Sequence, residues 1–178
     1  EGTWTHGSDE RAYRLELPLL GDRGGVTRSL WLNRPVLLRI GYEFDGSWNG
    51  YAPTLYVQAF RRIMDRLRAQ GVTNVAAVWQ SSGYTTSKST LLQWYPGDEY
   101  VDWMCVDGYN WGKTQSWSTW ESMRSVLAQS VEAMSTLSPK PIMVGDTASS
   151  EQGGDKAAWI LNGFAMLPNA LPRVDAVV

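Results

Sequence analysis

The sequence of 178 residues has very little cysteine and histidine, and this scarcity excludes several kinds of site. One cysteine, Cys105, allows no internal disulfide, and together with one histidine, His6, it leaves too few ligands for a zinc site. A serine-hydrolase triad is excluded because there is no Gly-x-Ser-x-Gly motif and no usable histidine. Neither a Gly-x-x-x-x-Gly-Lys loop nor a Gly-x-Gly-x-x-Gly motif is present, so the sequence predicts no nucleotide-phosphate site of these types.

Excess charge of one sign and long apolar runs are also missing. Lys and Arg total 16 against 18 Asp and Glu, so the strongly basic surface of a nucleic-acid-binding protein is excluded. No stretch approaches the roughly 18 apolar residues of a membrane helix, and the first residues lack a signal-peptide pattern. Tryptophan, in contrast, is abundant, with 10 residues beside 8 Tyr and 3 Phe. Rings with an apolar face and a polar edge favour a wet cleft such as a sugar site, with a Trp-rich core as the alternative.

From residue 34 onward, short apolar runs alternate with amphipathic segments, a pattern typical of parallel strands joined by helices. The sequence predicts strands over 35–41, 74–79, 100–106, 141–145 and 174–178, and helices over 54–70, 117–137 and 155–166. This order predicts an α/β fold. Two architectures fit it: a complete, small doubly wound sheet, or part of an eight-stranded barrel, which typically needs about 250 residues. Residues 1–33 show no sustained period and form a poorly defined segment.

Glu43 is the first candidate for chemistry, because it follows a predicted strand at the end where α/β proteins assemble their active sites. Trp48 and Tyr51 lie close behind it and could hold a sugar ring while Glu43 gives a proton to the bridging oxygen. The alternative is a structural ion pair with Arg39, because the two side chains share one face of a regular strand.

Asp146 follows the fourth predicted strand in the same way, so that two carboxyl groups could face each other across one cleft. A separation of about 5 Å is typical of a retaining glycosidase and one of about 6.5–9.5 Å of an inverting glycosidase. The alternative for Asp146 is a helix-capping or turn role. Further sugar platforms are predicted where the second and third strands end, at Trp79, Tyr109 and Trp111. Of the other tryptophans, Trp103 and Trp159 are assigned to the core, and Trp117 and Trp120 to the core or to helix docking.

Three stretches of the chain together resemble glycoside hydrolase family 26, the group that contains β-mannanases and related endo-glycanases. They are RPVLLRIGYEFDGSWNGY (34–51), YPGDEYVDW (95–103) with DGYNW (107–111), and KPIMVGD (140–146) with QGGDKAAWI (152–160). The resemblance implies a (β/α)8 barrel. Residues 34–178 would form a partial catalytic domain with strands four to seven and the beginning of strand eight, while the N-terminal strands have no counterpart in this chain.

The resemblance also implies a retaining double displacement, with Glu43 as the acid/base and position 146 as the nucleophile. The predicted substrate contacts are Arg39, Trp48, Tyr51, Trp79, Tyr109 and Trp111, and neither a cofactor nor a metal is expected. Two positions depart from the family pattern, because Asp146 stands where the family has Glu, and Tyr42 where many mannanases have His. The Asp carboxylate is set back by about 1.5 Å, and such a misplacement can cost about a hundredfold in rate.

The expected function is therefore endo-hydrolysis of a β-linked polysaccharide such as a mannan, outside the cell, by a protein that is monomeric if complete. No nucleic-acid or membrane partner is expected. One alternative is a non-catalytic carbohydrate-binding relic, which keeps the aromatic platforms while the shorter nucleophile cannot reach the sugar. Another is an incomplete product without a stable fold, because a barrel that lacks three strands leaves unpaired edges.

Overall fold

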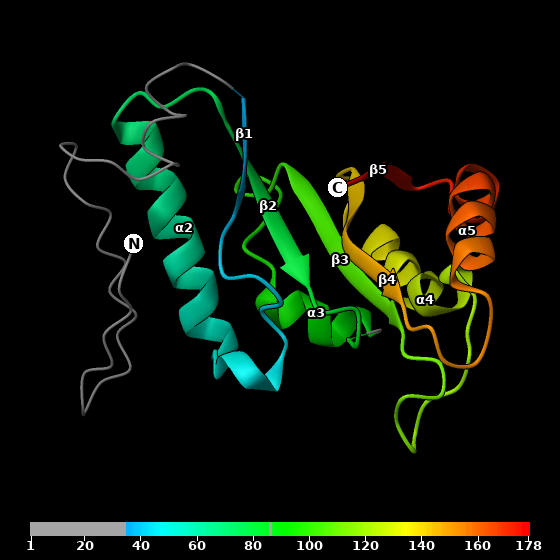
Figure 1. Cartoon of the computed structure of the whole chain (residues 1–178). Helices are drawn as coiled ribbons and strands as arrows, with labels where there is room; N and C mark the ends of the chain where they lie inside the picture. The colour runs from blue at the N-terminus through cyan, green and yellow to red at the C-terminus, as the bar shows by residue number, and fades with distance from the viewer. Residues whose placement is uncertain (1–34, 86) are drawn as a thin grey trace, which may run out of the picture.

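The computed structural model describes residues 35–85 and 87–178, and the prediction for residues 1–33 lies outside this part (Figure 1). The described part contains a five-stranded sheet in the order β1-β2-β3-β4-β5. Each strand pairs in parallel with the next. The strands are β1 (Val36–Arg39), β2 (Val75–Ser81), β3 (Trp103–Asn110), β4 (Ile142–Ser149) and β5 (Val174–Val177). All five agree with predicted strands, although their bounds differ by a few residues.

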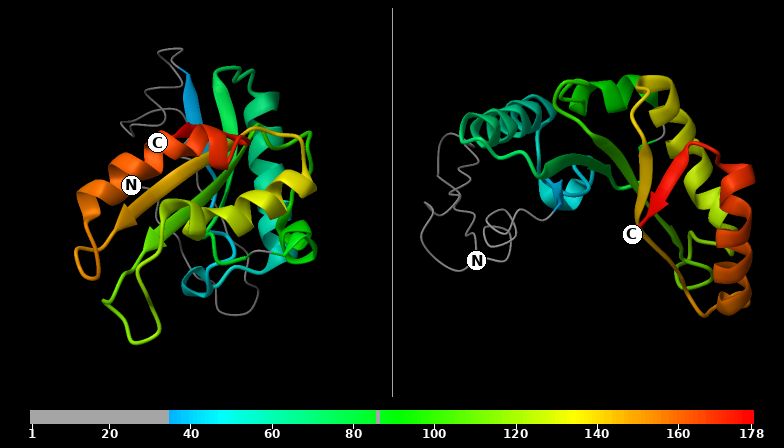
Figure 2. Two further views of the ribbon diagram at one scale, coloured as in Figure 1. Left: turned by 90° about the vertical axis from the view of Figure 1, so that its right-hand side faces the viewer. Right: turned by 90° about the horizontal axis from the view of Figure 1, so that it is seen from above.

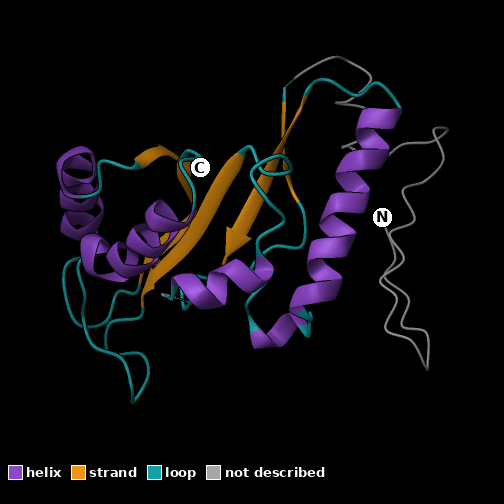
Figure 3. Cartoon of the chain, turned by 180° about the vertical axis from the view of Figure 1, so that it is seen from behind, coloured by secondary structure: helices purple, strands orange, loops and turns teal. Residues whose placement is uncertain are grey.

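The helices lie along one side of the curved sheet (Figures 2 and 3). They are α2 (Pro53–Ala69), α3 (Lys88–Trp94), α4 (Met123–Leu137) and α5 (Lys156–Ala170), and a short 3-10 helix, η1, covers Ser47–Asn49. A doubly wound sheet carries helices on both faces, whereas a barrel carries them only outside. The chain therefore folds as part of a (β/α)8 barrel, which confirms this prediction over the doubly wound alternative. No helix in the described part is long and apolar enough to span a membrane.

The helix ends follow from local sequence, and one predicted start is wrong. The Ser122 side chain accepts a hydrogen bond from the Ser125 backbone N–H at 3.1 Å and so caps α4. The predicted helix over 117–137 therefore begins only at Met123, and Trp117 lies in the preceding loop. In the same way, Asp155 accepts from the Ala158 backbone N–H at 2.9 Å and caps α5. Helix α3 was not predicted because its seven residues are too short for a clear period.

Buried apolar side chains form one large cluster between the helices and the sheet, and a smaller one on the opposite face. Alternation along the strands separates them: Trp79 belongs to the large cluster, whereas its neighbour Val78 belongs to the small one. The small cluster also contains Cys105 and Met143. This inner face, away from the helices, is the one that carries the polar side chains described next.

Phe44 anchors the turn after β1 in the large cluster. It has no exposed surface and stacks on Trp79 at a centroid distance of 4.4 Å. We expect Phe44→Ala to lower the free energy of unfolding by about 3–5 kcal/mol, because it leaves a cavity in a packed core. Urea unfolding followed by circular dichroism measures this change. Leu92→Ala, at a position on α3 that is 57% exposed, is the matched control, and equal losses in both variants would contradict the packing.

Candidate active site

Glu43 lies in the turn after β1 and has a φ of +46°, the only positive φ of a non-glycine residue in the described part. Such a backbone conformation costs about 1–3 kcal/mol and is common where function requires it. Two donors hold the Glu43 carbonyl oxygen, the Gly46 backbone N–H at 2.8 Å and Asn49 Nδ2 at 3.0 Å. Because β1 already ends at Arg39, the turn, and not the strand alternation assumed above, directs the Glu43 side chain.

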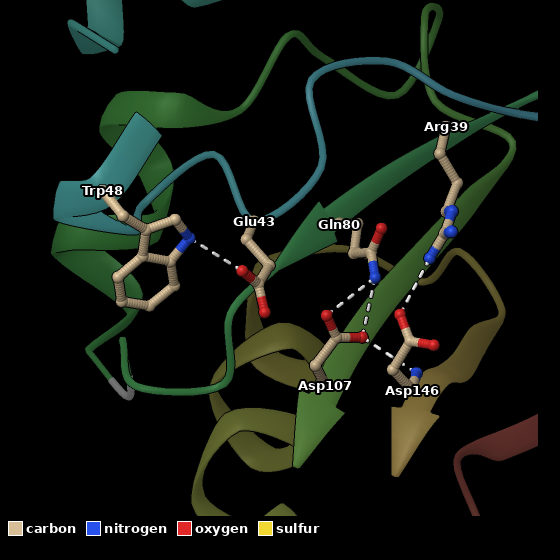
Figure 4. A network of polar contacts seen from close by, with 6 residues as sticks. All are labelled: Arg39, Glu43, Trp48, Gln80, Asp107 and Asp146. Carbon is tan, nitrogen blue, oxygen red and sulfur yellow. Dashed lines mark hydrogen bonds and ion pairs between the residues drawn. The ribbon is translucent and has the colours of Figure 1, made fainter. Parts of the chain in front are cut away.

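The carboxyl group of Glu43 is oriented by Trp48, whose Nε1 donates a hydrogen bond to Oε2 at 2.9 Å (Figure 4). The predicted alternative, an ion pair between Glu43 and Arg39, is wrong. Arg39 instead contacts Asp146, with 3.0 Å between the guanidinium NH1 and Oδ2. Both members of that pair are about half exposed, so the pair contributes little to stability and mainly fixes the two side chains.

A bulge in β4 brings Asp146 to the inner face of the sheet. Opposite the single residue Asp107 of β3, β4 has two residues, Gly145 and Asp146, and the flanking register pairs are Val106 with Val144 and Gly108 with Thr147. Regular alternation would turn Asp146 toward the helices, as it turns Val144. The extra residue directs it instead toward Arg39, in agreement with the frequent use of bulges beside active sites. The capping alternative for Asp146 is wrong, because Asp155 is the residue that caps α5.

Asp107 is a third carboxyl group of the site, and the sequence analysis did not identify it as an acid. It is 1% exposed, and it accepts hydrogen bonds from Gln80 Nε2 at 2.7 and 2.8 Å and from the Asp146 backbone N–H at 3.0 Å (Figure 4). Burial, the negative charge of Asp146 and contact with Glu43 raise the pKa of Asp107 to about 7, although the Gln80 hydrogen bonds oppose this rise. Asp107 thus connects the two predicted catalytic carboxyls.

Gly145 is required at the bulge by its close surroundings. A Cβ atom there would lie 2.5 Å from Cys105 Sγ and 2.9 Å from both Asp107 Oδ1 and Gln80 Nε2. Any larger residue would have to displace the Cys105 thiol, and the Asp107 carboxyl and the Gln80 amide that pair beside it would also be crowded.

The structure sorts the predicted sugar platforms into two groups. Trp48 and Trp111 are exposed, at 57% and 39%, and lie on the loops at the carboxyl ends of the strands. Tyr51 is half-buried and packs against the core, with its ring 6.0 Å from that of Tyr56. The prediction for Trp79 is wrong: it has no exposed surface, and its Nε1 donates to the Trp94 carbonyl oxygen at 3.0 Å.

Tyr109 lies among the three carboxyl groups. Burial raises its pKa to about 12, and the charges of Asp107, Asp146 and Glu43 add to this rise. The hydrogen bonds of the described residues include none from Tyr109 to Asp146. The predicted role of Tyr109 as a substrate contact stays a prediction.

The sequence analysis placed Trp117 wrongly and did not identify Tyr84. The assignment of Trp117 to the core or to helix docking is wrong, because it is 66% exposed and lies in the loop before α4. Tyr84, which follows β2, is 58% exposed, and its hydroxyl accepts a hydrogen bond from Trp111 Nε1 at 3.1 Å. Trp159, in contrast, is buried as predicted. Tyr84 carried a usable signal, since it stands only a few residues beyond a predicted strand, at the same edge as Glu43.

The site offers carboxylate chemistry. Within residues 35–85 and 87–178, no three His, Cys, Asp or Glu side chains are grouped so that they could hold a metal ion. What the inner face provides is a partly exposed Glu43, an exposed Asp146 and a buried Asp107 between them. A proton donor and a nucleophile at one edge, beside exposed indoles, suit cleavage of a glycosidic bond.

Comparison with known sequences identifies relatives over most of the chain. The model of Glycosyl hydrolase family 26 matches residues 29–165. Endoglucanase H of Acetivibrio thermocellus is 38% identical over 168 residues, which cover 88% of this chain and 18% of that protein. A beta-1,3-xylanase of Alcaligenes sp is 36% identical over 96 residues, which cover 50% of this chain and 20% of the relative. The chain thus spans about a fifth of the length of these relatives.

Solved structures of the same family share the fold. A GH26 beta-mannanase from Bacteroides ovatus superimposes with a TM-score of 0.61 at 25% identity, over 81% of this chain and 41% of that one. A modular endo-beta-1,4-mannanase from Cellulomonas fimi gives a TM-score of 0.62 at 22% identity, over 80% of this chain and 34% of the other. Because the family model matches well over half of its residues, the chain belongs to glycosyl hydrolase family 26.

Proposed function

We propose that this chain hydrolyses the glycosidic bonds of a β-linked polysaccharide, with Glu43 as the acid/base and Asp146 as the nucleophile. The main support is that a strained turn and a strand bulge bring Glu43 and Asp146 together beside the buried Asp107. The Glu43 side chain contacts Asp107, and the Asp146 backbone N–H donates a hydrogen bond to it. Relatives named as an endoglucanase, a beta-1,3-xylanase and beta-mannanases support a polysaccharide substrate. We further expect the protein to act outside the cell and, if complete, to be a monomer.

The proposed reaction is a double displacement. In the first step, Asp146 attacks the anomeric carbon while the bond to the bridging oxygen breaks, and Glu43 gives its proton to that oxygen. In the second step, Glu43 takes a proton from water, the water oxygen attacks the anomeric carbon, and Asp146 leaves as a carboxylate. The configuration of the sugar is thereby retained. Trp48 holds the Glu43 carboxyl and Arg39 holds that of Asp146, so both groups are oriented before substrate binds.

The second candidate is a non-catalytic sugar-binding protein. The observation that favours it is the short side chain of Asp146, which ends against Arg39 at 3.0 Å. A carboxylate set back in this way can miss the anomeric carbon while the exposed aromatic side chains still bind glycan.

Hydrolysis of soluble β-mannan, β-1,3-xylan and β-glucan, followed by reducing ends and viscosity, tests the proposal. We expect new reducing ends and a rapid fall in viscosity with at least one polysaccharide, and Asp146→Ala should abolish both. If the native chain releases nothing whereas Asp146→Glu does, the binding function is correct. If neither protein cleaves any of the three, the proposed hydrolysis is wrong.

A further inference from the structure

Four exposed aromatic side chains form a continuous row on the loops that follow β1, β2 and β3. We call this row the aromatic rim, and its members are Trp48, Tyr84, Trp111 and Trp117. Their exposed fractions are 57%, 58%, 39% and 66%, so each presents ring surface to the solvent. Large apolar groups gathered on a surface indicate a binding site, because they otherwise favour aggregation.

The rings of the aromatic rim hold one another in place. Trp48 and Tyr84 meet edge to face at a centroid distance of 6.2 Å. Trp111 Nε1 donates to the Tyr84 hydroxyl at 3.1 Å, and Trp111 meets Trp117 edge to face, again at 6.2 Å. The rim is therefore one connected set of rings that is ordered without being buried.

One end of the aromatic rim, Trp48, contacts the proposed catalytic centre directly. Trp117, at the other end, contacts Trp111, whose ring also lies 6.0 Å from that of Tyr109 beside the carboxyl groups. Two ring contacts therefore separate Trp117 from Tyr109. Trp48 Nε1 binds Glu43 Oε2 at 2.9 Å. From Trp48 the contacts run through Tyr84 and Trp111 to Trp117, which belongs to the long loop between β3 and α4. This loop projects beyond the carboxyl ends of the strands (Figure 1).

The loop that carries Trp117 is anchored by other residues. Three hydrogen bonds fix it, from the Lys113 backbone N–H to the Gln152 carbonyl at 2.9 Å, from Ser118 Oγ to the Gly112 carbonyl at 2.8 Å, and from the Glu121 backbone N–H to Asn110 Oδ1 at 2.9 Å. The indole of Trp117 is thus not needed to hold the loop, and its exposed face is available for a ligand.

We propose that Trp117 is an outlying glycan-binding platform, which stacks on a sugar unit remote from the bond being cleaved, and that Tyr84 and Trp111 contact the units between. The proposal rests on the proposed function, because it assumes that the substrate passes Glu43. A β-linked pyranose offers an apolar C–H face to an indole. The 6.2 Å between the rings of Trp48 and Tyr84, and between those of Trp111 and Trp117, is comparable with the length of one sugar unit.

The steep inclination of neighbouring rings sets the shape of the ligand. The ring planes of Trp48 and Tyr84 are inclined by 84°, and those of Trp111 and Trp117 by 64°. A glycan that contacts all four must therefore turn along its length. The ligand of the aromatic rim is a β-linked chain of several sugars that turns along its length, and short oligosaccharides reach only part of the rim.

Binding of sugars of different length tests the platform. We would titrate Glu43→Gln protein, which spares the ligand, with the disaccharide and hexasaccharide of the β-1,4-mannan, β-1,3-xylan and β-1,4-glucan series by calorimetry. In this background, Trp117→Ala should weaken binding of the preferred hexasaccharide about tenfold, with a clearly smaller effect on the disaccharide. Trp117→Tyr, which keeps a ring, should recover most of the affinity. Phe164→Ala, at an α5 position that is 43% exposed, is the control and should bind as the parent does.

The outcomes separate this proposal from the proposed hydrolysis. Hexasaccharide binding that depends on Trp117, in a native chain that cleaves nothing, supports the platform and contradicts hydrolysis. Cleavage with equal hexasaccharide affinity in the Trp117→Ala and parent proteins contradicts the platform alone. An equal loss for both sugar lengths also contradicts it, because the platform is placed beyond the sugars that Trp48, Tyr84 and Trp111 contact. If circular dichroism shows that the Trp117→Ala variant does not fold, the Trp117→Tyr and Trp117→Gln variants are compared instead. Hexasaccharide affinity that is kept in Trp117→Tyr and lost in Trp117→Gln supports a stacking role. Any other result overturns it.

Discussion

Glu43→Gln should lower kcat on a polysaccharide by about 100- to 10,000-fold, the usual contribution of a positioned proton donor. The amide keeps the size of the side chain, and its oxygen can still accept the hydrogen bond that Trp48 Nε1 gives to Glu43. What it lacks is the proton for the departing oxygen and the base that activates water. Initial rates of reducing-end release, measured for both proteins at the same pH, give the ratio directly.

The leaving group of the substrate distinguishes a lost proton donor from general damage. The dinitrophenolate of a dinitrophenyl glycoside leaves without being protonated. The rate of the first step in Glu43→Gln should therefore fall far less with this substrate than with polysaccharide. Asp45→Asn is the matched control, because Asp45 lies in the same turn but accepts hydrogen bonds from Ser81 Oγ at 2.8 Å and the Ser82 backbone N–H at 2.7 Å. If Glu43→Gln is slowed equally on both substrates, or no more than Asp45→Asn, Glu43 is not the acid.

Asp107→Asn should make the protein relatively more stable as the pH rises from about 4 to about 7. Burial, Asp146 and Glu43 raise the pKa of Asp107 to about 7 in the folded chain, whereas an unfolded Asp titrates near its ordinary value. The native state therefore binds more protons in this range, so the wild-type protein loses stability with rising pH. Asn resembles the protonated acid and does not ionise, so the difference in melting temperature between variant and wild type should increase up to about pH 7.

Asp98 supplies a control for which the expected change of stability with pH has the opposite sign. Hydrogen bonds from Tyr95 and Ser138 lower the pKa of Asp98, so the stability it contributes is present above its unfolded pKa and is lost as the pH falls. Asp98→Asn should therefore lose stability relative to wild type near neutral pH and match it in acid.

In kcat/KM profiles, Asp107→Asn should also lose the ionisation near pH 7. A stability difference for Asp107→Asn that does not change with pH contradicts the raised pKa.

The acidic form of Asp107 also suits its surroundings. Gln80 Oε1 is buried and accepts no hydrogen bond from the described residues, while Gln80 Nε2 donates to both oxygens of Asp107. A protonated Asp107 with the amide of Gln80 rotated would donate to Oε1 and still accept from Nε2. Asp107 holds the backbone of Asp146, and its ionisation near neutral pH changes the charge beside the carboxyls of Glu43 and Asp146.

Much of the fold could be predicted because its signals are local. Strands and crossover helices carry apolar residues at the periods that burial on one face requires, and α2 is framed by Pro53 and Gly71. The start of α4 was misjudged because apolar Trp117 was taken as part of a helix, although Ser122 is a cap that could have set the boundary. The alternation of side chains along β2 could also have placed Trp79 correctly. Val78 and Gln80 share the inner face, so Trp79 between them must face the helices.

Both acids of the proposed catalytic pair were singled out from the sequence, but the geometry that brings them together was not predicted. Glu43 reaches the site through a backbone conformation unusual for a non-glycine residue, and Asp146 through a single extra residue in β4. Both depend on pairing with neighbouring strands, which no local pattern reports. Asp107 was missed because a lone acid after an apolar run looks like a strand end, whereas its importance comes from burial between two other carboxyls.

Trapping of a covalent intermediate on Asp146 tests the proposed pair most directly. The chain would be incubated with a 2-deoxy-2-fluoro glycoside that carries a dinitrophenyl leaving group and the sugar of the polysaccharide it cleaves, and then digested for mass spectrometry. We expect one added sugar on the peptide that contains Asp146, and none in Asp146→Ala. Hydrolysis without any label and with inversion of the anomeric carbon, or a label on another carboxyl such as Asp107, would contradict the assignment of Asp146 as the nucleophile.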